Sequence, residues 1–249
     1  MKLNFFNRIL ALLIISVFPF KSYAEETKPT GENPKPTTWI ADLGLGYVKT
    51  TGNTETTTIK GDVKAVKEVE KWRHTLTAEG LNTSDRDTTT AERYFLSGKS
   101  DYKFTKFNYI YATATYDNDR FSGYDYRATV SVGYGRRIIH EPTLSLDGEI
   151  GPGMRYSKPD NGESDEEFLA RLAANLKWQI TDYSEFTQDL FSDIGEDATI
   201  TKSITALTAN INKSLALKLS YTYKYTSEVP VGIDKTDTET VVTIVYKYR

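Results

Sequence analysis

The sequence contains no cysteine and only two histidines among its 249 residues. The lack of cysteine excludes disulfides, thiolate metal sites and cysteine nucleophiles. Two histidines leave little for zinc binding or for acid–base catalysis. The formal net charge of -3 provides no basic surface of the kind that binds nucleic acid. The composition therefore predicts no cofactor, no metal site and no nucleic-acid partner, and it argues against an enzyme.

Long hydrophobic runs are also scarce. The mean hydropathy of -0.48 excludes a helical membrane protein with more than one span. Aromatic residues reach 12%, including 17 tyrosines, which argues against a disordered chain.

The apolar run that is present lies near the N-terminus. Lys2 and Arg8 precede and flank residues 9–18, which are apolar except for a serine, and Ser-Tyr-Ala at residues 22–24 resembles a cleavage site. The run is too short for a helix that spans a bilayer, which needs about 20 residues. The sequence predicts a cleaved signal peptide at residues 1–24. Residues 25–38 are polar with three prolines and predict a flexible periplasmic tail.

The rest of the chain, residues 39–249, alternates with a period of two. In residues 215–225 every odd-numbered residue is leucine or tyrosine, and the residues between them are mostly polar. This alternation indicates strands with one apolar and one polar face. About twelve such segments follow one another, with ten or fourteen as alternatives. They span residues 39–50, 55–67, 72–82, 92–104, 107–117, 124–137, 143–156, 167–179, 184–193, 200–212, 215–227 and 238–248.

The connections alternate between short turns and longer polar loops, such as residues 82–91, 157–166 and 228–237. Outer-membrane barrels have short periplasmic turns and longer external loops. The fold class predicted is therefore all-β: a single antiparallel up-and-down transmembrane β-barrel. Both termini would lie on the periplasmic side.

Aromatic residues on the apolar parity gather at the strand ends, where amphipathic rings favour the membrane interface. The predicted periplasmic girdle consists of Trp39, Trp72, Trp178, Tyr246 and Tyr248. The predicted girdle at the opposite rim consists of Tyr47, Tyr94, Tyr116, Tyr126 and Tyr225.

The opposite parity carries charges of both signs. Each would cost roughly 2–4 kcal/mol in lipid near the midplane, so we expect these side chains to line the lumen. The predicted lumen residues are Lys60, Asp62, Arg73, Glu79, Lys99, Asp101, Arg127, Asp147, Glu149, Arg155, Arg171 and Lys177. A narrow water-filled path and an ion-paired filling both fit this set. Positive charges predominate in it, so a pore would favour anions.

The sequence also contains candidate residues for a catalytic site and for a calcium site, and neither set is complete. His74 has outward parity near a rim and His140 falls in a short turn, and neither has an obvious serine partner. The acidic clusters at residues 117–119 and 160–167 lack the ligand spacing of a calcium loop and are expected to be solvated loops.

The first hairpin resembles a known family. The segments LGLGY at residues 43–47 and TTGNT at residues 50–54, followed by Trp72 and Arg73, are similar to the YdiY-like family. This is a domain-of-unknown-function group labelled as salt-induced outer-membrane proteins. The resemblance covers Trp39 to Arg249 and implies a β-barrel in the outer membrane of a Gram-negative bacterium. It implies no substrate and no catalytic residues. The chain departs from typical barrels in ending on Arg249 rather than on an aromatic residue.

Three functions remain open at this point. The leading hypothesis is a small pore or envelope component in salt or osmotic stress. The second is a structural or surface-interaction barrel with a non-conducting lumen, and the third, less favoured, is a lipid-modifying enzyme. The expected partners are outer-membrane lipid, lipopolysaccharide and the barrel-assembly machinery. The sequence leaves the oligomeric state open.

Overall fold

The structure is a computed structural model that describes residues 39–50, 56–86, 88–160 and 162–248. The signal peptide and the tail predicted for residues 1–38 lie outside the described residues. The part of the chain that the structure describes contains twelve strands and no helix. The strands are β1 (Ile40–Thr50), β2 (Thr56–Glu68), β3 (Trp72–Asp85), β4 (Thr88–Lys103), β5 (Asn108–Asp119), β6 (Tyr124–His140), β7 (Leu144–Pro159), β8 (Asp165–Thr181), β9 (Ser184–Gly195), β10 (Thr199–Asn210), β11 (Leu215–Thr226) and β12 (Thr236–Tyr248). Among these residues there is also no apolar helix long enough to cross a membrane.

Each strand pairs antiparallel with its neighbours in the chain, and β12 pairs with β1. The closing contact runs from Ala41 opposite Tyr248 to Gly46 opposite Thr243. Closure leaves no edge strand, so every strand has hydrogen-bonding partners on both sides. The prediction of a twelve-stranded up-and-down barrel is confirmed.

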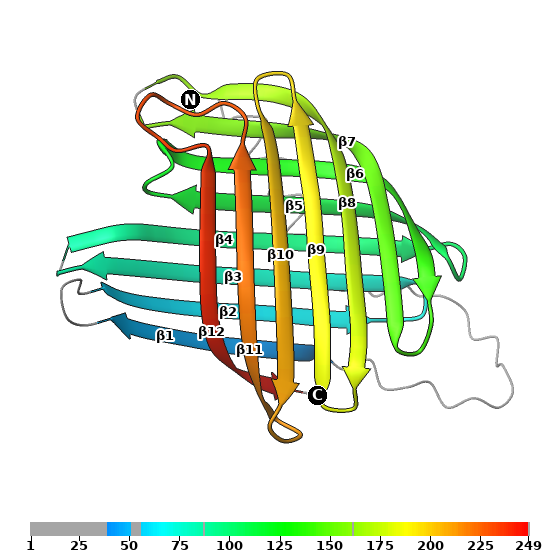
Figure 1. Ribbon diagram of the computed structural model, residues 1–249. Coiled ribbons are helices and arrows are strands. Elements are labelled where there is room, and N and C mark those ends of the chain that lie inside the picture. The colour runs from blue at the N-terminus through cyan, green and yellow to red at the C-terminus, as the bar shows by residue number, and fades with distance from the viewer. Residues whose placement is uncertain (1–38, 51–55, 87, 161, 249) are drawn as a thin grey trace, which may run out of the picture. The chain divides into compact units, whose positions relative to one another are not determined.

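Figure 1 shows how the wall is bent. Strands β1 to β6 form the far wall, β9 to β12 cross in front of them, and β7 and β8 curve between the two sets. We call the end at which β1 begins and β12 ends the terminal end, and the opposite one the loop end.

The connections differ from the expected pattern at one end. Turns at the terminal end are short, as predicted, but most connections at the loop end are short as well, because the strands run further than expected. The predicted loop at residues 82–91 is a hairpin whose strands are separated only by residues 86–87. Threonines 88–90 belong to β4, consistent with the strand preference of β-branched residues. The long connection is residues 227–235. Likewise, His140 is the last residue of β6 and does not lie in a turn.

Strands β6 and β7 approach unusually closely near their middle. A Cβ atom added to Gly151 would lie 2.1 Å from the Val132 carbonyl oxygen and 2.6 Å from the Gly133 Cα. At Gly135, two residues after Gly133 on β6, an added Cβ would lie 2.2 Å from the Tyr109 ring. Any larger residue at these positions would clash with neighbouring atoms, so glycine is required. Because glycine has no side chain, there is room inside the barrel for tyrosine rings.

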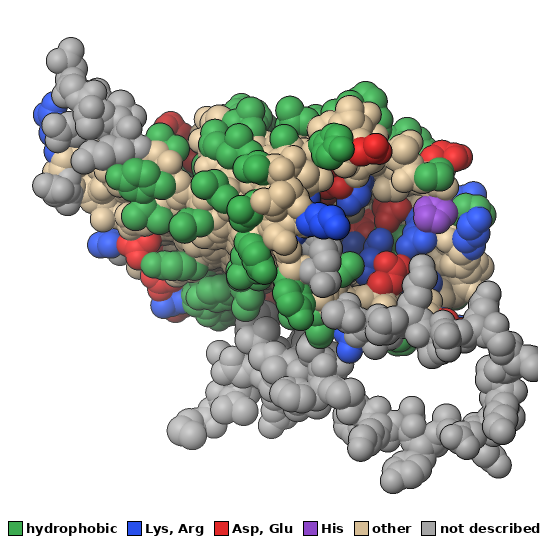
Figure 2. Space-filling view, turned by 90° about the horizontal axis from the view of Figure 1, so that it is seen from below, with side chains coloured by type: hydrophobic (Ala, Val, Ile, Leu, Met, Phe, Trp, Pro, Cys, Tyr) green, Lys and Arg blue, Asp and Glu red, His purple; other side chains and the backbone are tan. Residues whose placement is uncertain are grey.

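The alternation predicted from the sequence separates two faces. The exposed large hydrophobic side chains on the outer face are mainly leucine, isoleucine, valine and tyrosine, and Leu45, Val132 and Ile244 are 65%, 57% and 59% exposed. Figure 2 shows hydrophobic side chains spread over the outer surface, with acidic and basic side chains gathered in a recess. The apolar surface is thus outside and the charged surface inside, the reverse of a soluble protein.

Candidate functional site

The interior of the barrel is the candidate site, because most of the predicted lumen residues meet there. Eleven of the twelve are buried or half-buried on the inner face. They are Lys60, Asp62, Arg73, Glu79, Lys99, Asp101, Arg127, Asp147, Glu149, Arg155 and Arg171. Lys177 is different: it is exposed at the terminal end, where its Nζ lies 2.7 Å from Glu185 Oε2 on the neighbouring strand.

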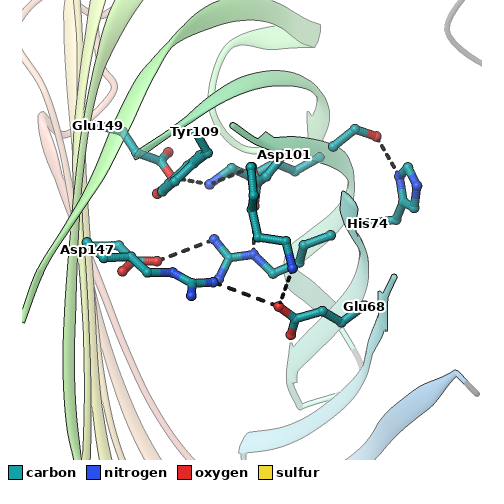
Figure 3. Close-up of polar contacts among 11 residues, drawn as sticks. Glu68, His74, Asp101, Tyr109, Asp147 and Glu149 are labelled. Atoms are coloured by element: carbon teal, nitrogen blue, oxygen red, sulfur yellow. Dashed lines mark hydrogen bonds and ion pairs between the residues drawn. The ribbon is translucent and has the colours of Figure 1, made fainter. Parts of the chain in front are cut away.

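Near the terminal end, Arg73 bridges the lumen. Its Nε donates to Asp101 Oδ2 at 2.7 Å on the adjacent strand β4. Its Nη2 donates to Asp147 Oδ2 at 3.3 Å on β7, four strands away. Figure 3 shows these acids converging on shared basic side chains, together with Glu68 and Glu149. The Arg73 guanidinium on β3 therefore connects β4 with β7 across the lumen.

A second bridge lies beside it. Lys99 on β4 forms an ion pair with Glu149 on β7, and the hydroxyl of Tyr109 donates to the same Glu149 oxygen at 2.7 Å. Tyr109 is 1% exposed. Its ring fits the space above Gly135, so the tyrosine fills the lumen and also orients the carboxylate.

The mouth at the terminal end carries the last of these contacts. Lys103 Nζ lies 2.8 Å from Glu68 Oε1, and Arg137 Nη2 lies 3.8 Å from the same oxygen. The Glu68 side chain is half exposed. Water reaches this part of the network, so salt screens these pairs more than the buried ones.

The central network lies toward the loop end. Arg93 Nη2 on β4 lies 3.4 Å from Glu79 Oε2 and 3.4 Å from Glu239 Oε2. Glu239 on β12 also pairs with Lys60. Lys218 Nζ on β11 lies 2.9 Å from Asp62 Oδ2 on β2. Arg93 and Glu79 lie on the neighbouring strands β4 and β3, and the other three pairs join strands that are not neighbours in the barrel.

Two contacts join strands on opposite sides of the ring. Lys224 Nζ on β11 lies 3.4 Å from Asp117 Oδ2 on β5, and the Lys202 ammonium on β10 lies 4.8 Å from the centre of the Phe95 ring on β4. In each case the two strands are six places apart in a ring of twelve. Lys202 and Lys224 are 7% and 4% exposed. Charged side chains therefore cross the lumen at this level.

A third network lies within β7, β8 and β9. The Arg155 Nε donates to Glu167 Oε1 at 2.7 Å, and the backbone amide of Asp197 donates to Glu167 Oε2 at 3.0 Å. Arg171 Nη1 contacts both oxygens of Asp193, at 2.8 and 2.9 Å. Arg155 is 2% exposed. These pairs brace the wall where it is most strongly curved.

The sequence reasoning missed several members of these networks. The residues that it missed are Asp117, Glu167, Asp193, Lys202 and Glu239. Asp117 and Glu167 belong to the acidic clusters that were expected to be solvated loops, but both lie in strands and face inward. The additional carboxylates remove the excess of positive charge on which the expected anion preference depended.

The predicted aromatic residues lie at the two ends of the outer surface. At the terminal end, Trp72, Trp178, Tyr246 and Tyr248 are exposed, and Trp39 is half-buried. At the loop end, Tyr116, Tyr126 and Tyr156 form a continuous stack with ring centroids 5.5 and 6.0 Å apart. Phe104, Phe107 and Tyr183 were not predicted as girdle residues, and they are exposed in turns at the terminal end. Their role as membrane girdles stays a prediction.

His74 has a serine partner, contrary to the expectation from the sequence. Its Nδ1 lies 2.9 Å from Ser100 Oγ on β4, and its ring stacks on Trp72 with centroids 5.7 Å apart. Both side chains have the outward parity, and in Figure 3 His74 points away from the inner acids. Within the described residues no carboxylate hydrogen-bonds to this histidine, so a Ser–His–acid triad is not assembled. The same residues contain no group of three potential metal ligands.

A closed barrel with an apolar exterior and a charged interior defines the class of outer-membrane-type β-barrels. The NanC porin has this fold, with a TM-score of 0.51 and 12% identity over 84% of this chain and 99% of that one. The COG4313 outer membrane channel from Pseudomonas putida F1 has a TM-score of 0.50 and 11% identity over 90% of this chain and 100% of that one. At these identities the likeness shows the fold alone.

Residues 43–248 match the family described as "Protein of unknown function, DUF481", and the chain belongs to this family. It is 31% identical over 206 residues to "Uncharacterized protein YdiY" of Escherichia coli (strain K12), covering 82% of this chain and 81% of that protein. The resemblance inferred from the first hairpin is confirmed.

Proposed function

We propose that this chain is an outer-membrane channel of low conductance for small polar solutes and ions, narrowed by ion pairs that cross its lumen. The observation that carries the proposal is the contact of Lys224 on β11 with Asp117 on β5, on the opposite side of the ring. Charges of both signs line a polar route whose width they also limit. A barrel of this size lies between the filled eight-stranded barrels and the open sixteen-stranded porins.

The membrane location is part of the proposal. The exposed apolar side chains would face acyl chains, and the aromatic residues at both ends would lie at the headgroups. Residues 1–24 would direct the chain across the inner membrane as a cleaved signal peptide. Outer-membrane lipid, lipopolysaccharide and the barrel-assembly machinery would then be its partners.

A response to salt follows from the same contacts. The Debye length falls from about 10 Å at 0.1 M salt to about 3 Å at 1 M, so cross-lumen pairs weaken as salt rises. The distances of 3.4 Å at Arg93 and Lys224 describe contacts looser than ideal charged hydrogen bonds. We therefore propose that the barrel opens wider in high salt, which would suit an envelope protein used under salt or osmotic stress.

Planar-bilayer recording tests the channel. Between 0.1 M and 1 M KCl, the conductance should rise by more than the roughly tenfold increase in ion concentration, because the pairs loosen. Replacing Glu239 by glutamine weakens the contacts to Lys60 and Arg93 and should raise the conductance at 0.1 M. The matched control is Glu185→Gln, which removes an exposed pair between neighbouring strands and should change nothing. A wild-type barrel and a Glu239→Gln variant that both fail to conduct would exclude the channel.

A structural barrel with a non-conducting lumen is the second candidate. It is favoured by the nearly complete burial of Tyr109 and Asp101, each 1% exposed, and by the contact of Lys202 with Phe95 across the ring. It predicts no conductance at any salt concentration, together with loss of envelope integrity when the gene is deleted. Enzymatic activity is not proposed, since His74 and Ser100 have no carboxylate partner among the described residues.

A further inference from the structure

A cavity of about 460 Å³ opens at the loop end, above the central network. It lies within the usual range of 300–1,000 Å³ for small-molecule sites. The loops at residues 120–123 and 227–235 both contribute to its lining and touch each other. A Cβ atom on Gly123, whose φ is +76°, would lie 2.9 Å from the Pro230 ring. The cavity is therefore partly roofed.

One cation in this cavity, Arg127, has no ion-pair partner among the described residues. The Arg127 side chain is 8% exposed, and its guanidinium lies 4.6 Å from the centre of the Tyr124 ring. Among the described residues no carboxylate lies within 4.0 Å of it, and no side chain hydrogen-bonds to it. A guanidinium presents five donors in a fixed fork that matches a carboxylate. Arg127 therefore offers an unfilled site for an anionic group.

A carboxylate in the same cavity, Asp237, also has no ion-pair partner among the described residues. Asp237 is exposed to the cavity, and no basic group of the described residues lies within 4.0 Å of its carboxylate. The nearest strand partner, Lys224, is directed to Asp117 and Asp119 instead, at 3.4 and 3.8 Å. Asp237 therefore offers an acceptor for an ammonium group.

The remaining charges indicate which ligand fits both groups. The lining includes five carboxylates and three basic side chains. They are Glu92, Asp119, Asp234, Asp237 and Glu239, with Arg93, Arg127 and Lys224. This surplus of negative charge repels a simple anion, and a simple cation leaves Arg127 without a partner. A ligand with one charge of each sign satisfies both groups.

We propose that this cavity binds a small zwitterion of the amino-acid type, a free amino acid or a short peptide. The ligand carboxylate lies on Arg127 and the ligand ammonium on Asp237. The hydroxyls of Thr222 and Thr226, on β11 beside Lys224, face the same space and can bind the peptide amide. The site deepens the proposed function by naming the solute class that would enter the channel.

Titration calorimetry of the refolded full barrel in detergent tests the site, with dialanine, N-acetyl-dialanine and dialanine amide as probes. Free dialanine should bind, and blocking either terminus should weaken binding about tenfold or more, since each blocked group loses a charged hydrogen bond. Arg127→Gln and Asp237→Asn should weaken binding of free dialanine to a similar degree. The controls are Arg136→Gln, at the other end of β6, and Asp182→Asn in a turn at the terminal end, which should not affect binding.

Each alternative result has a definite meaning. Binding of N-acetyl-dialanine as tightly as of dialanine would overturn the zwitterion site, because the ammonium would then play no part. The absence of dialanine binding, or binding unchanged in both variants, would overturn it too. Calorimetry does not require conduction, so binding without conductance would refute the channel alone, and conductance without binding would refute this site alone.

Discussion

Replacing Gly151 by alanine is expected to prevent the barrel from forming. The added methyl would lie 2.1 Å from the Val132 carbonyl oxygen and 2.6 Å from the Gly133 Cα. Both obstacles are backbone atoms, so no side-chain rotation relieves the clash. Overpacking costs 1–3 kcal/mol where side chains can adjust, and we expect more than about 3 kcal/mol here.

The measurement is the fraction of refolded protein that shows heat-modifiable gel mobility, followed through a urea titration. The matched control is Gly61→Ala, because an added Cβ at Gly61 meets no atom within 4 Å. Both substitutions reduce the freedom of the unfolded chain equally, so their difference reports the clash. Normal refolding of Gly151→Ala would show that β6 and β7 do not approach as closely as described.

Replacing Glu167 by methionine should be the second large change. It leaves the Arg155 guanidinium, which is 2% exposed, without its carboxylate, and it removes the acceptor for the Asp197 amide. Removing one partner of a buried ion pair typically costs about 3–5 kcal/mol, because an uncompensated charge remains. The free energy of unfolding should fall by that amount in a urea titration.

A double-mutant cycle separates the pair from the packing. Arg155→Met combined with Glu167→Met removes both charges and should regain most of the lost stability. Glu166→Gln is the control, since Glu166 is the exposed neighbour in β8, and it should change the stability by less than about 0.5 kcal/mol. A loss below about 1 kcal/mol in Glu167→Met would mean that water reaches Arg155 and compensates its charge.

The strands could be predicted because lipid would impose a simple rule on the outer face. In β11 every outward residue from Leu215 to Tyr225 is apolar, so the period of two is unmistakable. The residues between the outward ones must point inward, and this alternation places Arg73, Glu149 and Arg155 inside without knowledge of their partners.

The rest depended on contacts between strands that are distant in the sequence. Near the loop end both faces of a strand are polar, so parity did not reveal that Asp117 and Glu167 point inward. Tyr109 was not assigned to the lumen, because the space for its ring is created by Gly135 on another strand. Pairing partners such as Lys224 and Asp117 lie on strands six places apart in the closed ring, and the local sequence pattern does not encode contacts across the ring.

Quenching of tryptophan fluorescence by brominated phospholipids tests the central claim, an apolar outer surface in contact with lipid. The chain has three tryptophans, Trp39, Trp72 and Trp178, and all lie at the terminal end of the barrel. In liposomes, bromines near the headgroups should quench their emission strongly, and bromines near the chain ends should quench it weakly. Emission unaffected by bromine at any depth, yet quenched by acrylamide in water, would contradict the account.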